Sequence, residues 1–373
     1  MTSALHPEDL VTLPHEERER LHRQRSRTRV EIGPGMLLGT KYALLSELGR
    51  GGVGAVYAAE NTWTGRRVAV KVLRVEYTCG PRTIARFRHE AQVASRLRHP
   101  HIVDVIDMGF DEPNNAPYIV EELLEGEGFD AVLARSPGRR VSPEEALRVM
   151  LPVMDALAAC HAAGVVHRDV KPSNIFLCRT PRGEVVPKLI DFGVSKWPHD
   201  RRHVTVAGAL YGTPRYMAPE QARGEPGLDA RADVWAVGVT LFEALTGRCP
   251  FEKTPQRSVL AQAQRATPPR VRDVAPDVPA DVAAVIDRAL RTRREDRFAT
   301  MREFITALQG CEAAQALRPS GVRTIKRART KRDVAGHVVR WVRERPRTIA
   351  VAALVVMVDL LALLLLPLFW RGA

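Results

Sequence analysis

The sequence predicts an α+β protein with two parts of different secondary structure, followed by one membrane-spanning helix. Short β-rich runs separated by turns occupy residues 42–72. Runs with helical spacing dominate from residue 142 onward. An almost wholly apolar stretch lies at residues 348–370, close to the end of the 373-residue chain. At about 100–200 residues per domain, this length allows two or three folded units.

The N-terminal region precedes the predicted sheet. Residues 1–35 are charged, lack apolar periodicity and end in a Gly33-Pro34-Gly35 break, so we expect a disordered or loosely attached extension. Two turns interrupt the β-rich runs that follow, one at residues 49–54 and one at residues 61–65. The second is predicted to join two strands of a hairpin.

Two helices can be placed from their apolar spacing. The first covers residues 84–97 and must end near His99-Pro100, because the residue before a proline disfavours the α region. The second begins at the capping box Ser142-Pro143-Glu144-Glu145, with proline at the first helical position, and ends at Gly164. Helices of this kind predict a mostly α second part.

A glycine-rich run, Gly49-Arg50-Gly51-Gly52-Val53-Gly54, is the first sign of chemistry. The pattern alone is weak, because dinucleotide-binding folds use it in a strand-to-helix turn. Residues 55–59 read as a strand, so a hairpin over nucleotide phosphates fits better. Lys71 follows in an apolar strand, where an unpaired ammonium is costly, and Glu90 could be its partner. The alternative is a lysine whose ammonium reaches the surface.

Two further runs carry carboxylates and an amide. They are His167-Arg168-Asp169-Val170-Lys171-Pro172-Ser173-Asn174 and, seventeen residues after its asparagine, Asp191-Phe192-Gly193. Phosphoryl transfer from a magnesium nucleotide needs one carboxylate to orient a hydroxyl and other groups to hold the metal. Each residue alone could be an ordinary surface residue, but their joint occurrence argues against that interpretation.

These motifs, in this order, resemble the eukaryotic-type serine/threonine protein kinases, and most closely the bacterial membrane-anchored members. The resemblance covers about residues 41–308. It implies the two-lobe protein kinase fold, ATP and Mg²⁺ as cofactors, and proteins as substrates. Lys171 and the stretch of residues 212–217 resemble serine/threonine kinases and not tyrosine kinases, so the implied acceptors are serine and threonine hydroxyls.

The resemblance implies a role for each residue of the catalytic motifs. Asp169 would orient the substrate hydroxyl, and Lys171 would lie near the transferred phosphate. Lys71 would bind the α- and β-phosphates, with Glu90 fixing its ammonium. His167 is interpreted as a packing residue. The implied nucleotide-binding set is Gly49, Gly51, Gly52, Gly54, Val56, Ala69, Lys71, Glu122 and Leu123.

Metal binding and regulation follow from the same resemblance. Asn174 and Asp191 would hold Mg²⁺. Kinases with an arginine at the position of Arg168 commonly need a phosphate in the activation loop to neutralise it, and Thr205 is the predicted site. The implied supporting residues are Thr213, which would bond near Asp169, Glu220 with Arg297 as an internal ion pair, and Asp233 with Trp235 as braces of the catalytic loop.

Two features depart from the family pattern. Glu121 occupies the position where the family usually has an apolar residue or threonine behind the adenine, so either the alignment is shifted by one residue or the pocket is modified. The interval between Asn174 and Asp191 is long, and residues 179–183 predict an extended hairpin loop.

The formal net charge of +13 is concentrated near the C-terminus. Residues 318–347 hold eleven basic and two acidic side chains, a net charge of +9. Nucleic acid could bind such a tract, but the apolar residues 348–370 beside it favour a membrane surface, so we expect no nucleic-acid partner. The apolar stretch, interrupted only by Asp359, is long enough to span the hydrocarbon core, whereas a buried core helix would be amphipathic.

The basic side of this span predicts a cytoplasmic catalytic domain on a single-pass membrane protein. The predicted organisation is an extension at residues 1–35, a kinase domain at 36–308 with lobes at 36–120 and 121–308, a basic linker at 309–347, the membrane helix at 348–370 and an outer tail at 371–373. Asp359 suggests a possible homodimer. Five scattered cysteines indicate no disulfide framework or zinc site. The alternatives are a membrane-anchored pseudokinase scaffold and a small-molecule or lipid kinase.

Overall fold

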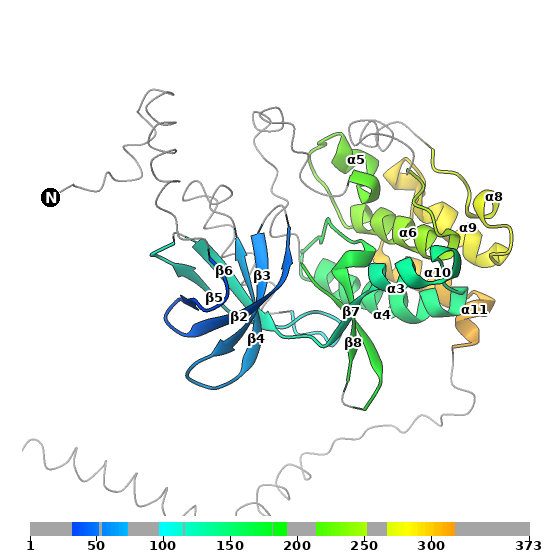
Figure 1. Cartoon of the computed structure of the whole chain (residues 1–373). Coiled ribbons are helices and arrows are strands. Elements are labelled where there is room, and N and C mark those ends of the chain that lie inside the picture. The colour runs from blue at the N-terminus through cyan, green and yellow to red at the C-terminus, as the bar shows by residue number, and fades with distance from the viewer. Residues whose placement is uncertain are drawn as a thin grey trace, which may run out of the picture. The chain divides into compact units, whose positions relative to one another are not determined.

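A β-sheet lobe leads into a larger, mostly helical lobe in the computed structural model (Figure 1). The structure describes residues 32–51, 54–73, 97–114, 116–180, 182–191, 214–251 and 267–317. Within these ranges, no helix combines the length and the apolar character needed to cross a membrane. Residues 84–96 of the predicted helix, most of the linker and the apolar stretch lie outside the described residues.

The first lobe is a six-stranded antiparallel sheet in the order β1-β2-β3-β4-β6-β5. The predicted turn at residues 61–65 is confirmed, because it joins two adjacent strands of this sheet and Gly65 has a φ of +68°. The strands are β1 (Leu37–Leu38), β2 (Tyr42–Arg50), β3 (Gly54–Asn61), β4 (Arg67–Leu73), β5 (Val105–Asp111) and β6 (Ala116–Glu122).

One face of the sheet in the first lobe is covered by apolar side chains. They form a cluster around Tyr57, Val70 and Val120, against which Ile32 and Met36 pack. The Tyr57 hydroxyl donates to the Ile32 carbonyl at 2.7 Å. Residues 32–35 were predicted to belong to the loose extension, but these contacts make them part of the folded lobe.

The second lobe is built around helices and a small antiparallel sheet in the order β7-β8-β9. The predicted hairpin is confirmed between β8 (Ile175–Arg179) and β9 (Val185–Leu189), but Arg179 belongs to β8 and the Thr180 N–H bonds to the Glu184 carbonyl, so the loop is shorter than predicted. The remaining strand is β7 (Gly126–Gly128), and the helices are α3 (Phe129–Arg135), α4 (Pro143–Ala162), α5 (Pro219–Ala222), α6 (Arg231–Thr246), α8 (Val271–Val274), α9 (Ala280–Ala289), α10 (Met301–Gln309) and α11 (Glu312–Gln315).

The capping box predicted at residues 142–145 is present at the start of α4. The Glu145 N–H donates to the Ser142 hydroxyl, and the Ser142 N–H donates to the Glu145 carboxylate. The described residues also contain four short 3-10 helices: η3 (Pro137–Arg139), η4 (Pro172–Asn174), η5 (Pro214–Tyr216) and η6 (Arg294–Asp296).

Helix α6 lies at the centre of the second lobe. Of its residues, all but Arg231 and Glu243 are buried, and Trp235 is among the largest fully buried side chains. At the other end of the lobe, Ala313 and Ala314 of α11 are also buried. The linker was predicted to begin at residue 309, but the folded lobe continues through α11, because these alanines complete its apolar core.

Candidate active site

Lys71 and Asp191 meet as a direct ion pair between the two lobes. Lys71 lies on β4 of the sheet lobe, and Asp191 follows β9 of the helical lobe. Burial opposes the charged form of both groups, but their mutual attraction prevails. It raises the pKa of Lys71 above its ordinary value and lowers that of Asp191. Two residues 120 positions apart in the sequence are therefore brought to one site.

The catalytic loop is folded tightly around Asp169. The ammonium of Lys171 lies 3.2 Å from an Asp169 carboxylate oxygen. The side-chain amide of Asn174, which lies in η4, donates to the Asp169 carbonyl at 2.8 Å. Because the amide nitrogen is used in this way, the amide oxygen of Asn174 is left for a ligand. These contacts bring the predicted Asp169, Lys171 and Asn174 together.

His167 is fully buried behind this loop. Its Nδ1 accepts the Asp169 N–H at 3.2 Å, and burial lowers the pKa of its ring. A neutral, enclosed imidazole supports the interpretation of His167 as a packing residue.

The carboxylate of Asp233, on α6, holds the backbone of the catalytic loop. Its two carboxylate oxygens accept the backbone N–H groups of His167 and Arg168, each at 2.8 Å. His161 of α4 lies 2.7 Å from the same carboxylate. Burial opposes ionisation of Asp233, yet these partners lower its pKa. Asp233 therefore braces the loop, as predicted from the sequence.

Trp235 was predicted to share this bracing role, and for this residue the role stays a prediction. Its indole stacks on Phe251 at 6.2 Å between ring centroids, and the guanidinium of Arg297 lies 4.9 Å from its ring. Trp235 lies on the same helix as Asp233, but two helical residues apart do not face the same way.

Arg168 and Asp191 both have left-handed backbone conformations, with φ of +65° and +58°. Such conformations are costly for residues other than glycine and are enriched at functional sites. The Nε atom of Arg168 is buried and has no hydrogen-bond partner among the described residues. A cationic group with unused hydrogen-bonding capacity thus lies directly beside Asp169.

The glycine-rich run forms a hairpin between β2 and β3, which confirms the prediction of a hairpin and not a strand-to-helix turn. The Gly51 N–H donates to the Gly54 carbonyl at 2.8 Å. A Cβ on Gly54 would lie 2.1 Å from the Val72 carbonyl oxygen, so only glycine fits there. Among the described residues, no atom lies within 4 Å of where a Cβ on Gly49 or Gly51 would be.

Val56, Ala69 and Lys71 share one face of the sheet, because Val56 pairs with Lys71 and residues two apart on a strand point the same way. Glu121 of β6 pairs directly with Ala69 and therefore lies on this face too. The alignment of Glu121 is thus correct, and it is the pocket that is modified. Burial, followed by the charge of Asp191, raises the pKa of Glu121 to about 7.

Glu121→Gln is expected to change stability in a pH-dependent way. The pKa of Glu121 is raised from 4.5 in the unfolded chain to about 7. The folded protein therefore binds the proton more tightly, and the contribution of this residue to stability falls as the pH rises through that range. We expect the substitution to raise the melting temperature at pH 8 by roughly 2–5 °C and to have little effect at pH 5. Thermal unfolding without nucleotide or metal measures this, and an equal shift at both pH values would contradict it.

The segment after Glu121 was predicted to contact the nucleotide. The Glu122 carboxylate is bonded instead to Lys188 and to the Asp104 N–H, so its side chain is engaged within the protein. Leu123 follows directly after β6, between the two lobes. Any contact of Glu122 with a nucleotide would therefore use its backbone carbonyl.

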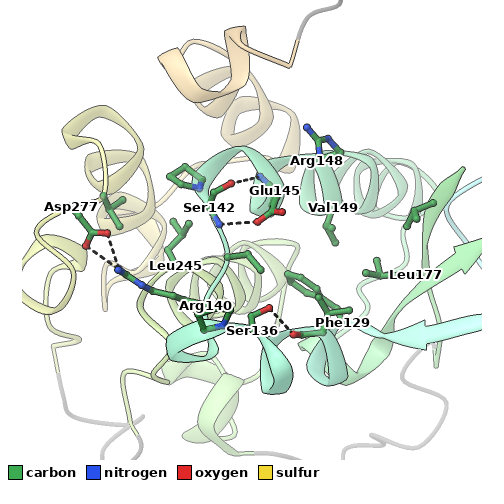
Figure 2. Close-up of a pocket in the computed structure, with 16 residues that line it drawn as sticks. Phe129, Ser136, Arg140, Ser142, Glu145, Arg148, Val149, Leu177, Leu245 and Asp277 are labelled. Carbon is green, nitrogen blue, oxygen red and sulfur yellow. Dashed lines mark hydrogen bonds and ion pairs between the residues drawn. The ribbon is translucent and has the colours of Figure 1, made fainter.

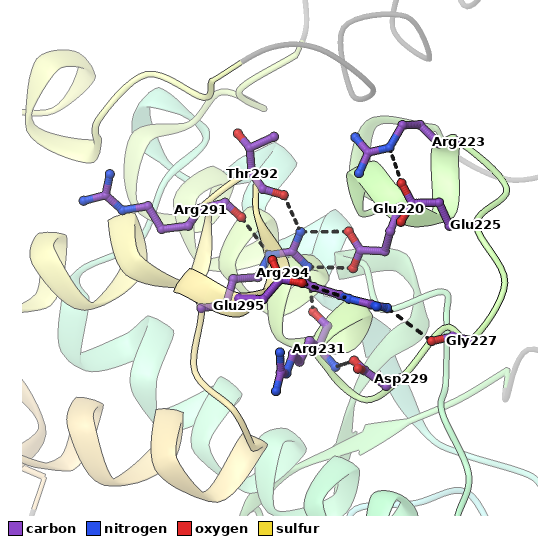
Figure 3. Close-up of polar contacts among 11 residues, drawn as sticks. Glu220, Arg223, Glu225, Gly227, Asp229, Arg231, Arg291, Thr292, Arg294 and Glu295 are labelled. Carbon is purple, nitrogen blue, oxygen red and sulfur yellow. Dashed lines mark hydrogen bonds and ion pairs between the residues drawn. The ribbon is translucent and has the colours of Figure 1, made fainter.

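The supporting ion pair between Glu220 and Arg297 is confirmed. Two guanidinium nitrogens of Arg297 each lie 2.8 Å from a carboxylate oxygen of Glu220, and both side chains are almost fully buried. The guanidinium also donates to the carbonyls of Arg231, Arg291 and Thr292, which surround it (Figure 3).

Several predicted residues lie outside the described part of the chain. These are Glu90, Gly52, Thr205 and Thr213. The structure also shows two contributors that sequence reasoning missed, His161 beside Asp233 and Lys188 beside Glu122. His161 is one of the few polar residues near the end of the apolar helix α4, and this was the signal available in the sequence. Lys188 has no comparable local signal.

A cavity of about 700 Å³ lies in the helical lobe, among α3, the start of α4 and the β8–β9 hairpin. Phe129, Leu177 and Leu245 form part of its apolar wall, and Arg140 pairs with Asp277 at its edge (Figure 2). Its lining includes none of the described residues that the sequence assigned to the active site. We therefore place the active site between the lobes and not here.

The residues between the lobes fit a magnesium nucleotide. Carboxylate and amide oxygens, as on Asp191 and Asn174, are ligands that Mg²⁺ accepts together with phosphate oxygens. The ammonium of Lys71 is a suitable partner for phosphate, and the open glycine hairpin allows close approach of the backbone. Asp169 lies on the adjoining loop, where it can meet an acceptor hydroxyl.

Comparison with known proteins agrees with this geometry. Residues 42–308 match the family model described as "Protein kinase domain". The serine/threonine-protein kinase Pkn1 of Myxococcus xanthus is 40% identical over 299 residues, covering 79% of this chain and 42% of the relative. PknA of Mycobacterium tuberculosis is 35% identical over 329 residues, covering 84% of this chain and 74% of the relative.

Solved structures show the same fold. The crystal structure of the Mycobacterium tuberculosis PknI kinase domain matches with a TM-score of 0.60 and 29% identity, covering 75% of this chain and 99% of that chain. The chain spans about two fifths of the length of several curated relatives, 42% of Pkn1 and 40% of a Streptomyces coelicolor kinase.

Proposed function

The chain belongs to the protein kinase family, and on this premise we propose that it is an ATP-dependent serine/threonine protein kinase with Mg²⁺ as its metal. The observation that carries the proposal is the ion pair of Lys71 with Asp191 between two lobes of the kinase fold, with the charge of Asp169 close enough to help raise the pKa of Lys71. The kinase names of the curated relatives support the same reaction class.

Each residue has a defined task in this proposal. Bound Mg-ATP supplies the phosphoryl group and neutralises charge during transfer. Asp169 orients the acceptor hydroxyl and takes its proton, while Lys171, 3.2 Å from Asp169, stabilises negative charge beside it. Lys71 and Asp191 balance each other's charge without a ligand. In the proposed complex Lys71 would face phosphate and Asp191 would face the metal, so both charges would stay compensated.

The pseudokinase scaffold gains no support from the site. A scaffold without catalysis would tolerate loss of the groups that perform chemistry, whereas Lys71, Asp169, Asn174 and Asp191 are all present and grouped. The small-molecule or lipid kinase is disfavoured by the resemblance of residues 212–220 to protein kinases. We therefore propose protein serine and threonine hydroxyls as acceptors.

Autophosphorylation of Thr205 is the proposed means of activation. Support comes from Arg168, a cation beside Asp169 whose Nε has no described hydrogen-bond partner. Thr205→Ala is expected to lower activity on an exogenous protein about tenfold or more while leaving the dissociation constant for nucleotide within about twofold. Kinetics and fluorescent-nucleotide titration measure this, with Ser195→Ala as the control. Fully active enzyme without phosphate on Thr205 by mass spectrometry would contradict the proposal.

Anchoring by residues 348–370 is proposed from the sequence. Residues 349–369 contain fourteen Leu, Val, Ile or Phe. On the insertion scale they favour the bilayer by roughly 4–8 kcal/mol, against a cost of about 2.5–3.5 kcal/mol for Asp359. We expect the full chain in the membrane fraction with the catalytic domain on the cytoplasmic side, and a chain ending at residue 317 in the soluble fraction. Recovery of the full chain as soluble protein would exclude the anchor.

Dimerisation through the membrane helix is a further part of the proposal. A carboxyl at Asp359 needs a polar partner, and the same residue of a second copy could be that partner. Crosslinking in membranes should give a lower dimer yield for Asp359→Leu than for the parent. An unchanged yield would exclude this pairing.

A further inference from the structure

Glu122, at the end of β6, is tied to the segment that precedes β5. Its N–H donates to the Asp104 carbonyl at 3.0 Å, and the Asp104 N–H donates back to the Glu122 carboxylate at 2.9 Å. This reciprocal pair fixes the direction of the Glu122 side chain. The carboxylate points away from the face that carries Glu121, because neighbouring residues of a strand point to opposite faces.

Lys188 of β9 reaches the same Glu122 carboxylate and forms an ion pair with it. Lys188 lies three residues before Asp191. The side chains of Lys188 and Glu122 are only 17% and 25% exposed, so water screens this pair less than it screens most surface pairs.

The backbone of β9 is held by the same region. The Val103 N–H donates to the Leu189 carbonyl at 3.0 Å, and the Leu189 N–H donates to the His101 carbonyl at 2.8 Å. The Ile190 N–H donates to the Asn174 carbonyl at 2.9 Å. The residues just before Asp191 are therefore fixed on one side by the segment 101–104 and on the other by the catalytic loop.

These contacts form a series that runs through both lobes and returns to the residue where it began, Lys71. Lys71 of β4 pairs with Ile119 of β6, three residues before Glu122. Glu122 pairs with Lys188, β9 continues to Asp191, and Asp191 returns to Lys71. Because the sheet fixes the step from Lys71 to Glu122, the Glu122–Lys188 pair adds a side-chain link between β6 and β9 to the backbone bonds that hold β9.

We propose that Lys188 and Glu122 are positioning residues, which hold the strand carrying Asp191 against the end of β6 and so keep Asp191 within reach of Lys71. Neither side chain needs to touch substrate. The effect on catalysis rests on the proposed function of the site. The contact itself does not, and it can be tested in the nucleotide-free protein.

The test combines hydrogen exchange with kinetics on the full chain. In Lys188→Met we expect the Leu189 and Ile190 amides to exchange about tenfold faster without nucleotide, as for a local opening made about 1.4 kcal/mol easier. Activity should show a kcat about tenfold lower, with KM for ATP changed less than threefold. Lys188→Arg should stay within about threefold of the parent in both measurements, because the cation is kept.

Two further variants make the result specific. Lys41→Met removes a lysine that pairs with Asp107 at 2.6 Å, with both side chains 32% exposed, inside the sheet lobe. It should leave kcat and the Leu189 and Ile190 amides unchanged. Glu122→Gln keeps an oxygen that can accept the Asp104 N–H but removes the charge that pairs with Lys188, so it should speed exchange of the same amides in the same direction as Lys188→Met.

The outcomes separate the inference from the proposed function. Unchanged exchange in Lys188→Met would overturn the inference, and so would unchanged exchange in Glu122→Gln. Faster exchange with an unchanged kcat would show a structural contact without a positioning role and would also overturn it. A parent chain with no kinase activity would count against the proposed function, while the exchange measurements would still decide whether the pair holds β9 against the end of β6.

Discussion

Asp169→Asn is expected to lower kcat for protein phosphorylation by about 10²- to 10⁴-fold. Asparagine keeps the shape of the side chain but cannot accept the proton of the acceptor hydroxyl. The backbone contacts of this residue, from its N–H to His167 and from Asn174 to its carbonyl, do not depend on the carboxylate. The loop should therefore keep its fold, and the loss should be confined to chemistry.

The control for this prediction is nucleotide binding. The dissociation constant for Mg-ATP should stay within about threefold of the parent value, because Asp169 does not hold the nucleotide in the proposed site. Steady-state kinetics and fluorescent-nucleotide titration give the two numbers. A kcat reduced less than about fivefold would show that another group performs the role given to Asp169.

Arg297→Met is expected to cause the largest loss of stability. The substitution leaves the Glu220 carboxylate buried without its partner, and breaking a buried pair in this way costs about 3–5 kcal/mol. It also removes the donors to three backbone carbonyls. The melting temperature should fall by roughly 6–15 °C.

Arg294→Met is the matched control, since Arg294 lies in the same region in Figure 3 but pairs with Glu295 near the surface at 3.4 Å. Its substitution should change the free energy of unfolding by less than about 0.5 kcal/mol. Calorimetry of the parent and both variants measures the difference. Equal losses for Arg297→Met and Arg294→Met would contradict the importance of the buried pair.

The elements that could be predicted from the sequence are those specified by local patterns. The capping box at Ser142 needs only four consecutive residues, and the turn at residues 61–65 and the glycine hairpin are also local. The groups around Asp169 are close in the sequence, so their meeting follows from one short loop. The Glu220–Arg297 pair is distant in the sequence and could be predicted only through the family resemblance.

The features that could not be predicted depend on packing between distant segments. The contacts of Ile32 and Met36 with the sheet, and of α11 with the helical lobe, arise from apolar surface that becomes available only after folding. The pairing of Lys188 with Glu122 joins two segments across the lobes, and neither residue stands out in its own strand.

The most direct test of the central claim is to incubate the purified chain with Mg-ATP and an exogenous protein and to map the phosphorylated residues by mass spectrometry. We expect phosphoserine or phosphothreonine with the parent chain, and none above background with Lys71→Met, which removes the ammonium paired with Asp191. Phosphorylation that persists in Lys71→Met, or its absence from the parent, would contradict the assignment of Lys71, Asp169 and Asp191 as the site of a serine/threonine protein kinase.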